Sequence, residues 1–197
     1  MTLQGVMPIF YRGAAIGTYW HCHDARKTGF TSQSPGMQTN TNRLTNHIAR
    51  GTVASPFISL TRSYGVAWSY AVFLSRTQPK RSRPAYVYEI EFDDSPPLGL
   101  LLLDPIKEVA NALPPPLSQT SYHHDGVQTF LLGVVDPDSM KQFLTTPIVQ
   151  PPPRGGTQRP ANLSIELETL VRALRDAEIL AVGTIPASCV RNRYAEY

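Results

Sequence analysis

Apolar and polar residues alternate most regularly in "PAYVYEIEF" (84–92), where β-branched and aromatic residues fill most positions. A period of two predicts a strand with one buried face. Four shorter apolar runs predict further strands: "MPIFYRG" (7–13), "SPFISLT" (55–61), "GVQTFLLGVV" (126–135) and "EILAV" (178–182). Glycine or proline lies at or beside the ends of most of these runs, as is typical of strand boundaries.

Helical spacing is clearest in segment 162–175, where four leucines share one face: Leu163, Leu167, Leu170 and Leu174. Segments 63–76 and 104–113 also predict helices, and 43–50 is compatible with one. Strands and helices are interspersed without a regular βαβ alternation. The pattern therefore predicts an α+β fold rather than a doubly wound parallel sheet.

The chain has 197 residues, of which 42% are hydrophobic and 17% are charged. This composition supports a packed core, and the length suits one domain. Proline-rich segments at 114–116 and 151–160 are expected to be exposed loops within that single domain, 1–197.

The formal net charge of +3 and the pI near 8.9 are compatible with an anionic ligand, but no Lys/Arg stripe predicts a nucleic-acid surface. Cys22 and Cys189 are far apart, so we expect two buried free thiols rather than a disulfide framework. The first residues lack the pattern of a signal peptide, and no run of 18 apolar residues predicts a membrane span. We expect a soluble protein made in a cytoplasm with no membrane partner, and delivery into a target cell remains open.

Common nucleotide, metalloprotease and serine-hydrolase motifs are absent from the sequence. "WHCHD" (20–24) gathers two histidines, a cysteine and an aspartate, but it has no second ligand pair, so we expect a structural role and no metal. "YHHDG" (122–126) places His123, His124 and Asp125 before a predicted strand. A polar loop is the favoured interpretation there, and a binding role stays open.

Three chemically distinct side chains fall at the ends of predicted strands: Arg12, Ser59 and Glu178. A guanidinium suits bidentate contact with phosphate, and a serine hydroxyl can position a neighbouring side chain. A carboxylate can bind a ribose and stabilise positive charge on a sugar during cleavage of a glycosidic bond.

These motifs resemble the ADP-ribosyltransferase fold, in the Arg–Ser–Glu class of cholera and pertussis toxins and arginine-modifying ectoenzymes. "FYRG" matches the aromatic–Arg strand, and "FISLT" matches the second motif at Phe57, Ser59 and Thr61, with Leu60 in place of its middle threonine. "DAEILAVGTIP" matches the last motif, in which Glu178 takes the catalytic position and a Gly-x-Ile-Pro turn follows the strand. The order and wide spacing of the three motifs also agree with the class.

The resemblance implies a split mixed or antiparallel β-sandwich flanked by helices, with NAD as the substrate. Arg12 would contact a phosphate and the nearby backbone, and Gly13, Ser59 and Thr61 would complete the dinucleotide site. Ser59 would order Glu178, which would bind the 2′-hydroxyl of the nicotinamide ribose. Nicotinamide would then leave, and ADP-ribose would pass to a protein or nucleic-acid acceptor.

Asp176 departs from the family, which has Glu or Gln at this position and uses it in choosing the acceptor. The shorter side chain puts arginine specificity in doubt. A target-recognising loop is also expected just before the motif, where the periodicity predicts the helix 162–175. The loop at 151–160 is an alternative for that role.

Two segments imitate the last motif: 126–140 has Gln128 in place of the glutamate, and Glu89 and Glu91 lie in mid-strand. Neither is followed by the Gly-x-Ile-Pro turn. We expect a chance likeness for 126–140, and solvent-facing or cross-strand roles for the two glutamates.

The leading hypothesis is a NAD-dependent mono-ADP-ribosyltransferase, serving as a toxin, effector or defence domain. An NAD glycohydrolase of the same fold is the second hypothesis. The third is an inactive binding or immunity module, and an antitoxin or immunity protein is an expected partner class for the first two.

Overall fold

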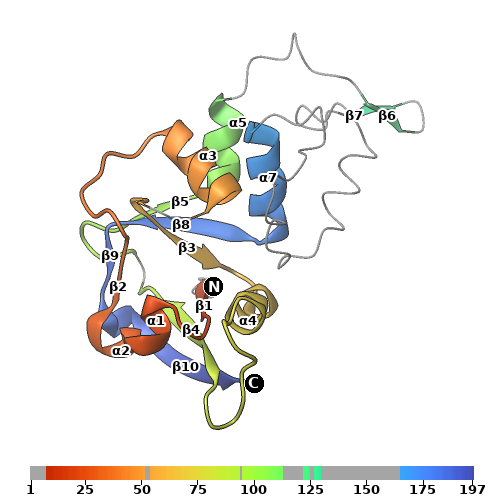
Figure 1. Cartoon of the computed structure of the whole chain (residues 1–197). Helices are drawn as coiled ribbons and strands as arrows, with labels where there is room; N and C mark the ends of the chain where they lie inside the picture. The colour runs from red at the N-terminus through yellow and green to blue at the C-terminus, as the bar shows by residue number, and fades with distance from the viewer. Residues whose placement is uncertain (1–7, 52–53, 94, 113–121, 125–126, 130–164) are drawn as a thin grey trace, which may run out of the picture.

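The computed structural model describes residues 8–51, 54–93, 95–112, 122–124, 127–129 and 165–197. Six strands form one antiparallel sheet (Figure 1). Their order across the sheet is β10 (Val190–Glu196), β4 (Ala85–Glu91), β1 (Ile9–Ala14), β3 (Phe57–Thr61), β8 (Glu178–Val182) and β5 (Leu101–Leu103). Helices and this sheet make an α+β fold, as the sequence predicted, and the sheet is antiparallel rather than mixed.

The sheet is divided at the junction between β1 and β3, which share the single register pair Tyr11–Thr61. By contrast, β1 pairs with β4 along its whole length, as β3 does with β8. The two three-stranded halves run in different directions in Figure 1. Apolar residues from both halves, among them Phe10, Ile90, Ile58 and Ile179, belong to one buried cluster. The main core therefore lies between the halves, which holds them together where backbone pairing is sparse.

Three helices cover the half formed by β3, β8 and β5 (Figure 1): α3 (Thr41–Arg50), α5 (Pro105–Ala112) and α7 (Ile165–Arg175). Five buried residues fill this second core: Leu44, Phe57, Val109, Leu170 and Leu180. On the other half, α4 (Tyr64–Phe73) packs on β1 at Gly13. A Cβ atom at Gly13 would lie 2.2 Å from the Ala67 carbonyl oxygen, so this close approach requires glycine.

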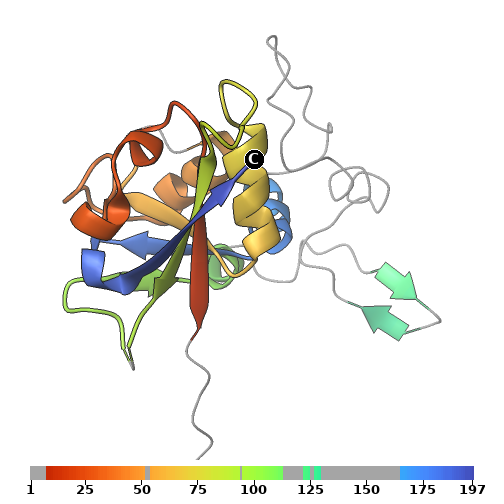
Figure 2. The same ribbon diagram turned by 90° about the horizontal axis from the view of Figure 1, so that it is seen from below.

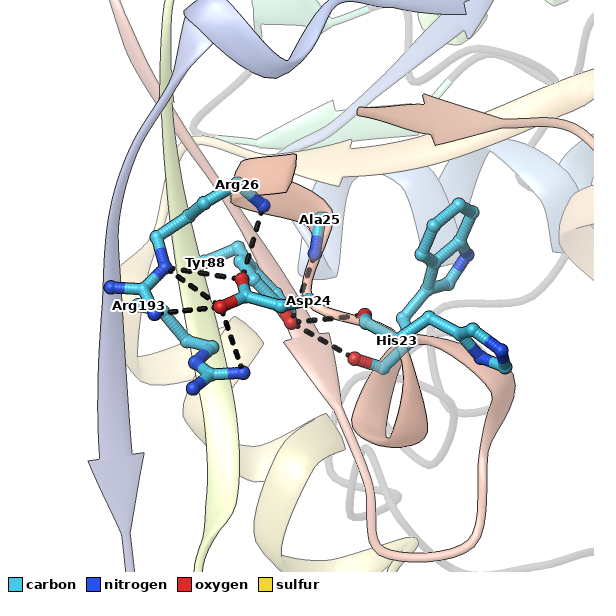
Figure 3. A network of polar contacts seen from close by, with 7 residues as sticks. His23, Asp24, Ala25, Arg26, Tyr88 and Arg193 are labelled. Atoms are coloured by element: carbon cyan, nitrogen blue, oxygen red, sulfur yellow. Dashed lines mark hydrogen bonds and ion pairs between the residues drawn. The ribbon is translucent and has the colours of Figure 1, made fainter. Parts of the chain in front are cut away.

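Short elements close the end of the molecule opposite α3, α5 and α7: α1 (Tyr19–Cys22), α2 (Ala25–Thr28) and β2 (Phe30–Thr31), which pairs with β9 (Thr184–Ile185). Asp24 caps α2, binds the Arg26 guanidinium and forms an ion pair with Arg193 of β10 (Figure 3). The "WHCHD" segment thus fastens α2 to the sheet. Among the described residues, no group of three or more His, Cys, Asp or Glu side chains could hold a metal ion.

Most predicted elements occur where the sequence placed them, with ends shifted by a few residues. In the region 113–164 the structure describes two short strands, β6 (Tyr122–His124) and β7 (Val127–Thr129). Strands β2, β5, β6, β9 and β10 were not predicted, and β6 at 122–124 corrects the expectation of a polar loop there, because these residues pair with β7. The rest of the predicted strand 126–135, Asp125 and the loops 114–116 and 151–160 lie outside the described residues.

Both cysteines are free, but Cys22 is exposed, which corrects the expectation of two buried thiols. The exposure follows from its place on the short surface helix α1, which has no buried residue. In the part of the chain that the structure describes, none of the helices combines the length and apolar character needed to cross a bilayer.

Candidate active site

A cavity of about 360 Å³ lies where the two halves of the sheet meet α4 and the end of α7. Its lining includes the six residues that the sequence singled out: Arg12, Gly13, Ser59, Thr61, Asp176 and Glu178. They come from β1, β3 and the α7–β8 connection, and 166 residues separate the first from the last in the sequence. The volume lies in the range of small-molecule sites, about 300–1,000 Å³.

The turn between α7 and β8 places Glu178 in the wall of the cavity. Ala177 has a φ of 46°, a left-handed conformation that ends α7 and redirects the chain. The Ala177 carbonyl then accepts a hydrogen bond from the Arg62 backbone N–H, 3.1 Å away, just beyond β3. Glu178 follows as the first residue of β8, paired with Thr61.

Arg12 lies between the two halves, and its guanidinium donates a hydrogen bond to the Ser59 carbonyl oxygen. Its Nε atom is buried and has no hydrogen-bond partner among the described residues. Desolvation lowers the pKa of Arg12 to about 10, against the opposing effect of the Glu178 charge. The guanidinium remains charged at neutral pH and holds a buried donor available to a ligand.

Ser59 connects two side chains that lie on different elements. Its hydroxyl lies 2.7 Å from Nε2 of His47 on α3. The same hydroxyl interacts with Glu178 and lowers the pKa of that carboxyl group. On the other side of the imidazole, Nδ1 lies 2.6 Å from the Ser55 hydroxyl oxygen. A hydrogen-bonded row of three residues therefore leads toward Glu178: Ser55, His47 and Ser59.

The direction of each hydrogen bond in this row follows from the donors available. Burial, and secondarily the Arg12 charge, lowers the pKa of His47 to about 4, so its ring is neutral at neutral pH. An ionised Glu178 can only accept, so Ser59 donates its proton to Glu178 and accepts from His47 Nε2. Nδ1 then accepts from Ser55, whose oxygen in turn accepts from the Phe57 backbone N–H. Every hydroxyl proton in the row is thus used.

Burial, together with the nearby Asp176 charge, raises the pKa of Glu178 to about 7. The Ser59 hydrogen bond and the charges of Arg12 and Arg175 act in the opposite direction. A carboxyl group poised near neutrality in a cavity is a candidate functional group, because its charge is costly unless a ligand compensates it.

Asp176 lines the same cavity, but its carboxylate is held inside the protein. It accepts hydrogen bonds from the Tyr70 hydroxyl at 2.8 Å and from the Arg175 guanidinium at 2.9 and 3.2 Å. The Thr61 hydroxyl donates to the Asp176 backbone oxygen. Asp176 is only 6% exposed, so its charge acts on Glu178 through the protein rather than through water.

His47 was not singled out by the sequence. The signal was its spacing, because Leu44 and His47 lie three residues apart on a helix and so share the buried face of α3. A buried histidine needs hydrogen-bond partners, and two serines in the next segment, Ser55 and Ser59, supply them.

Of the two segments that imitate the last motif, the one with Glu89 and Glu91 does not line this cavity. Glu89 accepts hydrogen bonds from Asn192 and Tyr194 of β10, and Glu91 forms an ion pair with Arg191. Both are cross-strand partners, as expected. The Gln128 side chain lies outside the described residues.

No family model and no curated protein matches the chain. Among solved structures, the chain is similar to a nicked form of the CARDS toxin, with a TM-score of 0.41 and 15% sequence identity. That similarity covers 96% of this chain but 25% of the toxin chain, so the chain spans about a quarter of the toxin's length.

Proposed function

We propose that the protein is a NAD-dependent mono-ADP-ribosyltransferase that acts as a toxin, effector or defence domain. The observation that carries this proposal is the convergence of Arg12, Ser59 and Glu178 on one cavity, with the Ser59 hydroxyl held by His47. A cation, a fixed hydroxyl and a buried carboxylate are the groups needed to bind a dinucleotide and cleave its glycosidic bond.

In the proposed reaction, the bond between the nicotinamide nitrogen and C1′ of the ribose breaks. Nicotinamide leaves with the electron pair, which neutralises its positive charge, and positive charge develops at C1′. Glu178 accepts a hydrogen bond from the ribose 2′-hydroxyl and stabilises that charge. The acceptor then forms a bond to C1′ and loses its proton to solvent.

The other two residues position the substrate and the carboxylate. Ser59 holds Glu178 in one orientation, and His47 fixes the direction of the Ser59 hydroxyl. Arg12 would contact the diphosphate, and its buried Nε supports this assignment because it has no partner among the described residues. Fixing these groups in advance avoids reorganisation during the reaction.

Hydrolysis of NAD is the second candidate function, and one observation favours it. The Asp176 carboxylate, the group that would orient an acceptor, is already bound to Arg175 and Tyr70. Water would then take the acceptor's place, and the products would be nicotinamide and free ADP-ribose.

The test uses NAD labelled in its adenylate half, incubated with the full chain alone, with cell lysate protein and with nucleic acid. Nicotinamide release together with label on a macromolecule is the expected result. Nicotinamide release with free ADP-ribose in every mixture would establish the glycohydrolase instead. Absence of nicotinamide from all mixtures would overturn both functions and leave a binding module.

A further inference from the structure

Three tyrosines from separate elements gather on the face of the sheet that carries α4: Tyr11 of β1, Tyr64 of α4 and Tyr194 of β10. The Tyr11 and Tyr64 ring centroids lie 5.4 Å apart, edge to face, and those of Tyr64 and Tyr194 lie 5.7 Å apart. Figure 2 shows the end of β10 beside α4, where these elements meet. Tyr64 and Tyr194 are each 37% exposed, so solvent or a partner reaches their rings.

Two carboxylates are fixed at the edges of this cluster. Glu89 accepts hydrogen bonds from the Tyr194 hydroxyl at 2.9 Å and from Asn192 at 2.6 Å. Glu196 accepts one from the Tyr64 hydroxyl. We call the three tyrosines with Glu89 and Glu196 the tyrosine–glutamate face.

Neither glutamate of this face has a cationic partner in the part of the chain that the structure describes. No Lys, Arg or His side chain among the described residues lies within 4.0 Å of either carboxylate. Two nearby acids differ in this respect, because Glu91 and Asp93 both form ion pairs with Arg191. Neutral donors orient Glu89 and Glu196 without cancelling their charge, so the face presents two negative charges and aromatic rings together.

Strand register connects this face to the candidate catalytic carboxylate. Glu89 pairs with Tyr11, Tyr11 pairs with Thr61, and Thr61 pairs with Glu178. Directly paired residues point to the same side of an antiparallel sheet, and three strand spacings amount to about 14 Å. Tyr11 also lines the cavity that contains Glu178. A partner lying on the tyrosine–glutamate face would therefore lie beside the cavity, with Tyr11 common to both.

We propose that the tyrosine–glutamate face docks a basic segment of a protein acceptor beside the catalytic cavity. Aromatic rings and carboxylates both attract Lys and Arg side chains, and the same two charges repel the phosphates of a nucleic acid. In an extended acceptor, about 14 Å corresponds to four residue steps from the basic side chain to the modified one. The inference rests on the proposed transferase activity and specifies its acceptor as a protein.

Arg12 lies inside the catalytic cavity, and two further basic side chains lie on the flank away from the tyrosine–glutamate face. Arg43 and Arg50 line a separate cavity of about 400 Å³ on α3, in the half of the molecule away from β10 (Figure 1). His47 and Gly51 line both that cavity and the one with Glu178. The two flanks of the site thus carry opposite charge, which keeps a phosphate-bearing substrate and a basic acceptor apart.

The test measures binding to the full chain by fluorescence anisotropy with three labelled probes of equal length. These are a 12-residue peptide of alternating lysine and glycine, the same peptide with glutamate for lysine, and a 12-nucleotide single-stranded DNA. The wild type is compared with Glu89→Gln, Glu196→Gln and their combination. Glu108→Gln on α5 removes one charge away from the face and serves as the matched control.

We expect the lysine peptide to bind best, with its Kd raised at least fivefold in each single variant, further in the combination, and less than twofold in Glu108→Gln. Tighter binding of DNA than of the lysine peptide would overturn the proposal and favour a nucleic-acid acceptor. Equal effects of Glu89→Gln and Glu108→Gln, or no binding of the lysine peptide, would overturn it as well.

Nicotinamide release without any acceptor separates this proposal from the proposed function. We expect release to be unchanged in Glu89→Gln and Glu196→Gln, because neither residue lines the cavity. Normal release with charge-insensitive peptide binding would refute the docking face alone. Charge-dependent peptide binding with no release by the wild type, either alone or with lysate protein or nucleic acid, would refute the transferase and leave the face as a binding surface for basic peptides.

Discussion

His47 Nε2 lies 2.7 Å from the Ser59 hydroxyl oxygen and so ties α3 to the strand that faces Glu178. Because the imidazole is neutral and donates to Ser59, the serine proton is directed at the Glu178 carboxylate. Helix α3 therefore influences the pKa of Glu178 indirectly, because His47 of α3 orients Ser59 and Ser59 lowers that pKa. This dependence can be measured.

Replacing Ser59 by alanine removes the hydrogen bond that lowers the pKa of Glu178. The rate of nicotinamide release should fall at low pH as Glu178 becomes protonated, because Glu178 must be ionised to stabilise the ribose charge; we call this part of the pH profile the acid limb. In Ser59→Ala we expect the midpoint of the acid limb to shift from about pH 7 to a pH higher by about 0.5–1 unit. The measurement is kcat for nicotinamide release between pH 5 and 9. Ser69→Ala, which removes a hydroxyl on α4, is the control and should leave the profile in place. An unshifted limb in Ser59→Ala would show that this hydrogen bond does not set the Glu178 charge.

Replacing Asp176 by asparagine should move the same limb in the opposite direction. The Asp176 charge raises the pKa of Glu178, so its removal favours ionisation and extends activity to lower pH. The variant should also unfold at a lower temperature, because Arg175 loses a buried ion-pair partner. The pH profile and the melting temperature are compared with those of Asp93→Asn, an exposed acid. An upward shift of the limb would contradict the assigned effect of Asp176.

Replacing Glu178 by glutamine should stabilise the fold at alkaline pH. The folded pKa of about 7 lies above the unfolded value near 4.5, so the folded state binds more protons between these pH values and loses stability as the pH rises. Above pH 7 the wild type carries the whole cost of the buried charge, roughly 2–3 kcal/mol. Removing that cost should raise Tm by about 4–10 °C at pH 8 and leave it nearly unchanged at pH 4.5. An equal change at both pH values would contradict a raised Glu178 pKa.

Replacing His47 by glutamine should protect the fold against acid. The folded pKa of about 4 lies below the ordinary value of 6.5, so the unfolded chain binds the proton first and wild-type stability falls between pH 6.5 and 4. Denaturant midpoints at pH 4.5 and 7 measure the loss, which should be smaller in the variant. His23→Gln, at an exposed position, is the control and should retain the wild-type loss. A variant that keeps the full acid sensitivity would show that His47 does not cause it.

The strands that carry Arg12, Ser59 and Glu178 were predictable because each contains a short β-branched or aromatic run with a distinct boundary. Strand β10 was missed because "VRNRYAE" is mostly polar, as suits an exposed edge. Its position is set by tertiary contacts, such as those of Tyr194 with Glu89. Strand β5 was missed because three leucines are too few to show a period.

The order of the site residues in the sequence predicted a shared site, but it did not predict the hydrogen bonds among the residues of that site. Whether Asp176 faces an acceptor or an internal partner depends on Tyr70 of α4, 106 residues away. The link between His47 and Ser59 depends on how α3 packs on β3. Such contacts arise from the packing of whole elements, and periodicity along the chain does not encode them.

The most direct test of the account is nicotinamide release from NAD at pH 8 by the wild type and by Glu178→Gln, with Glu108→Gln as the charge-matched control. The account predicts release by the wild type and by Glu108→Gln, and a rate at least 100-fold lower in Glu178→Gln, although that variant is the more stable protein. Equal rates in the wild type and in Glu178→Gln, or no release by the wild type, would contradict it.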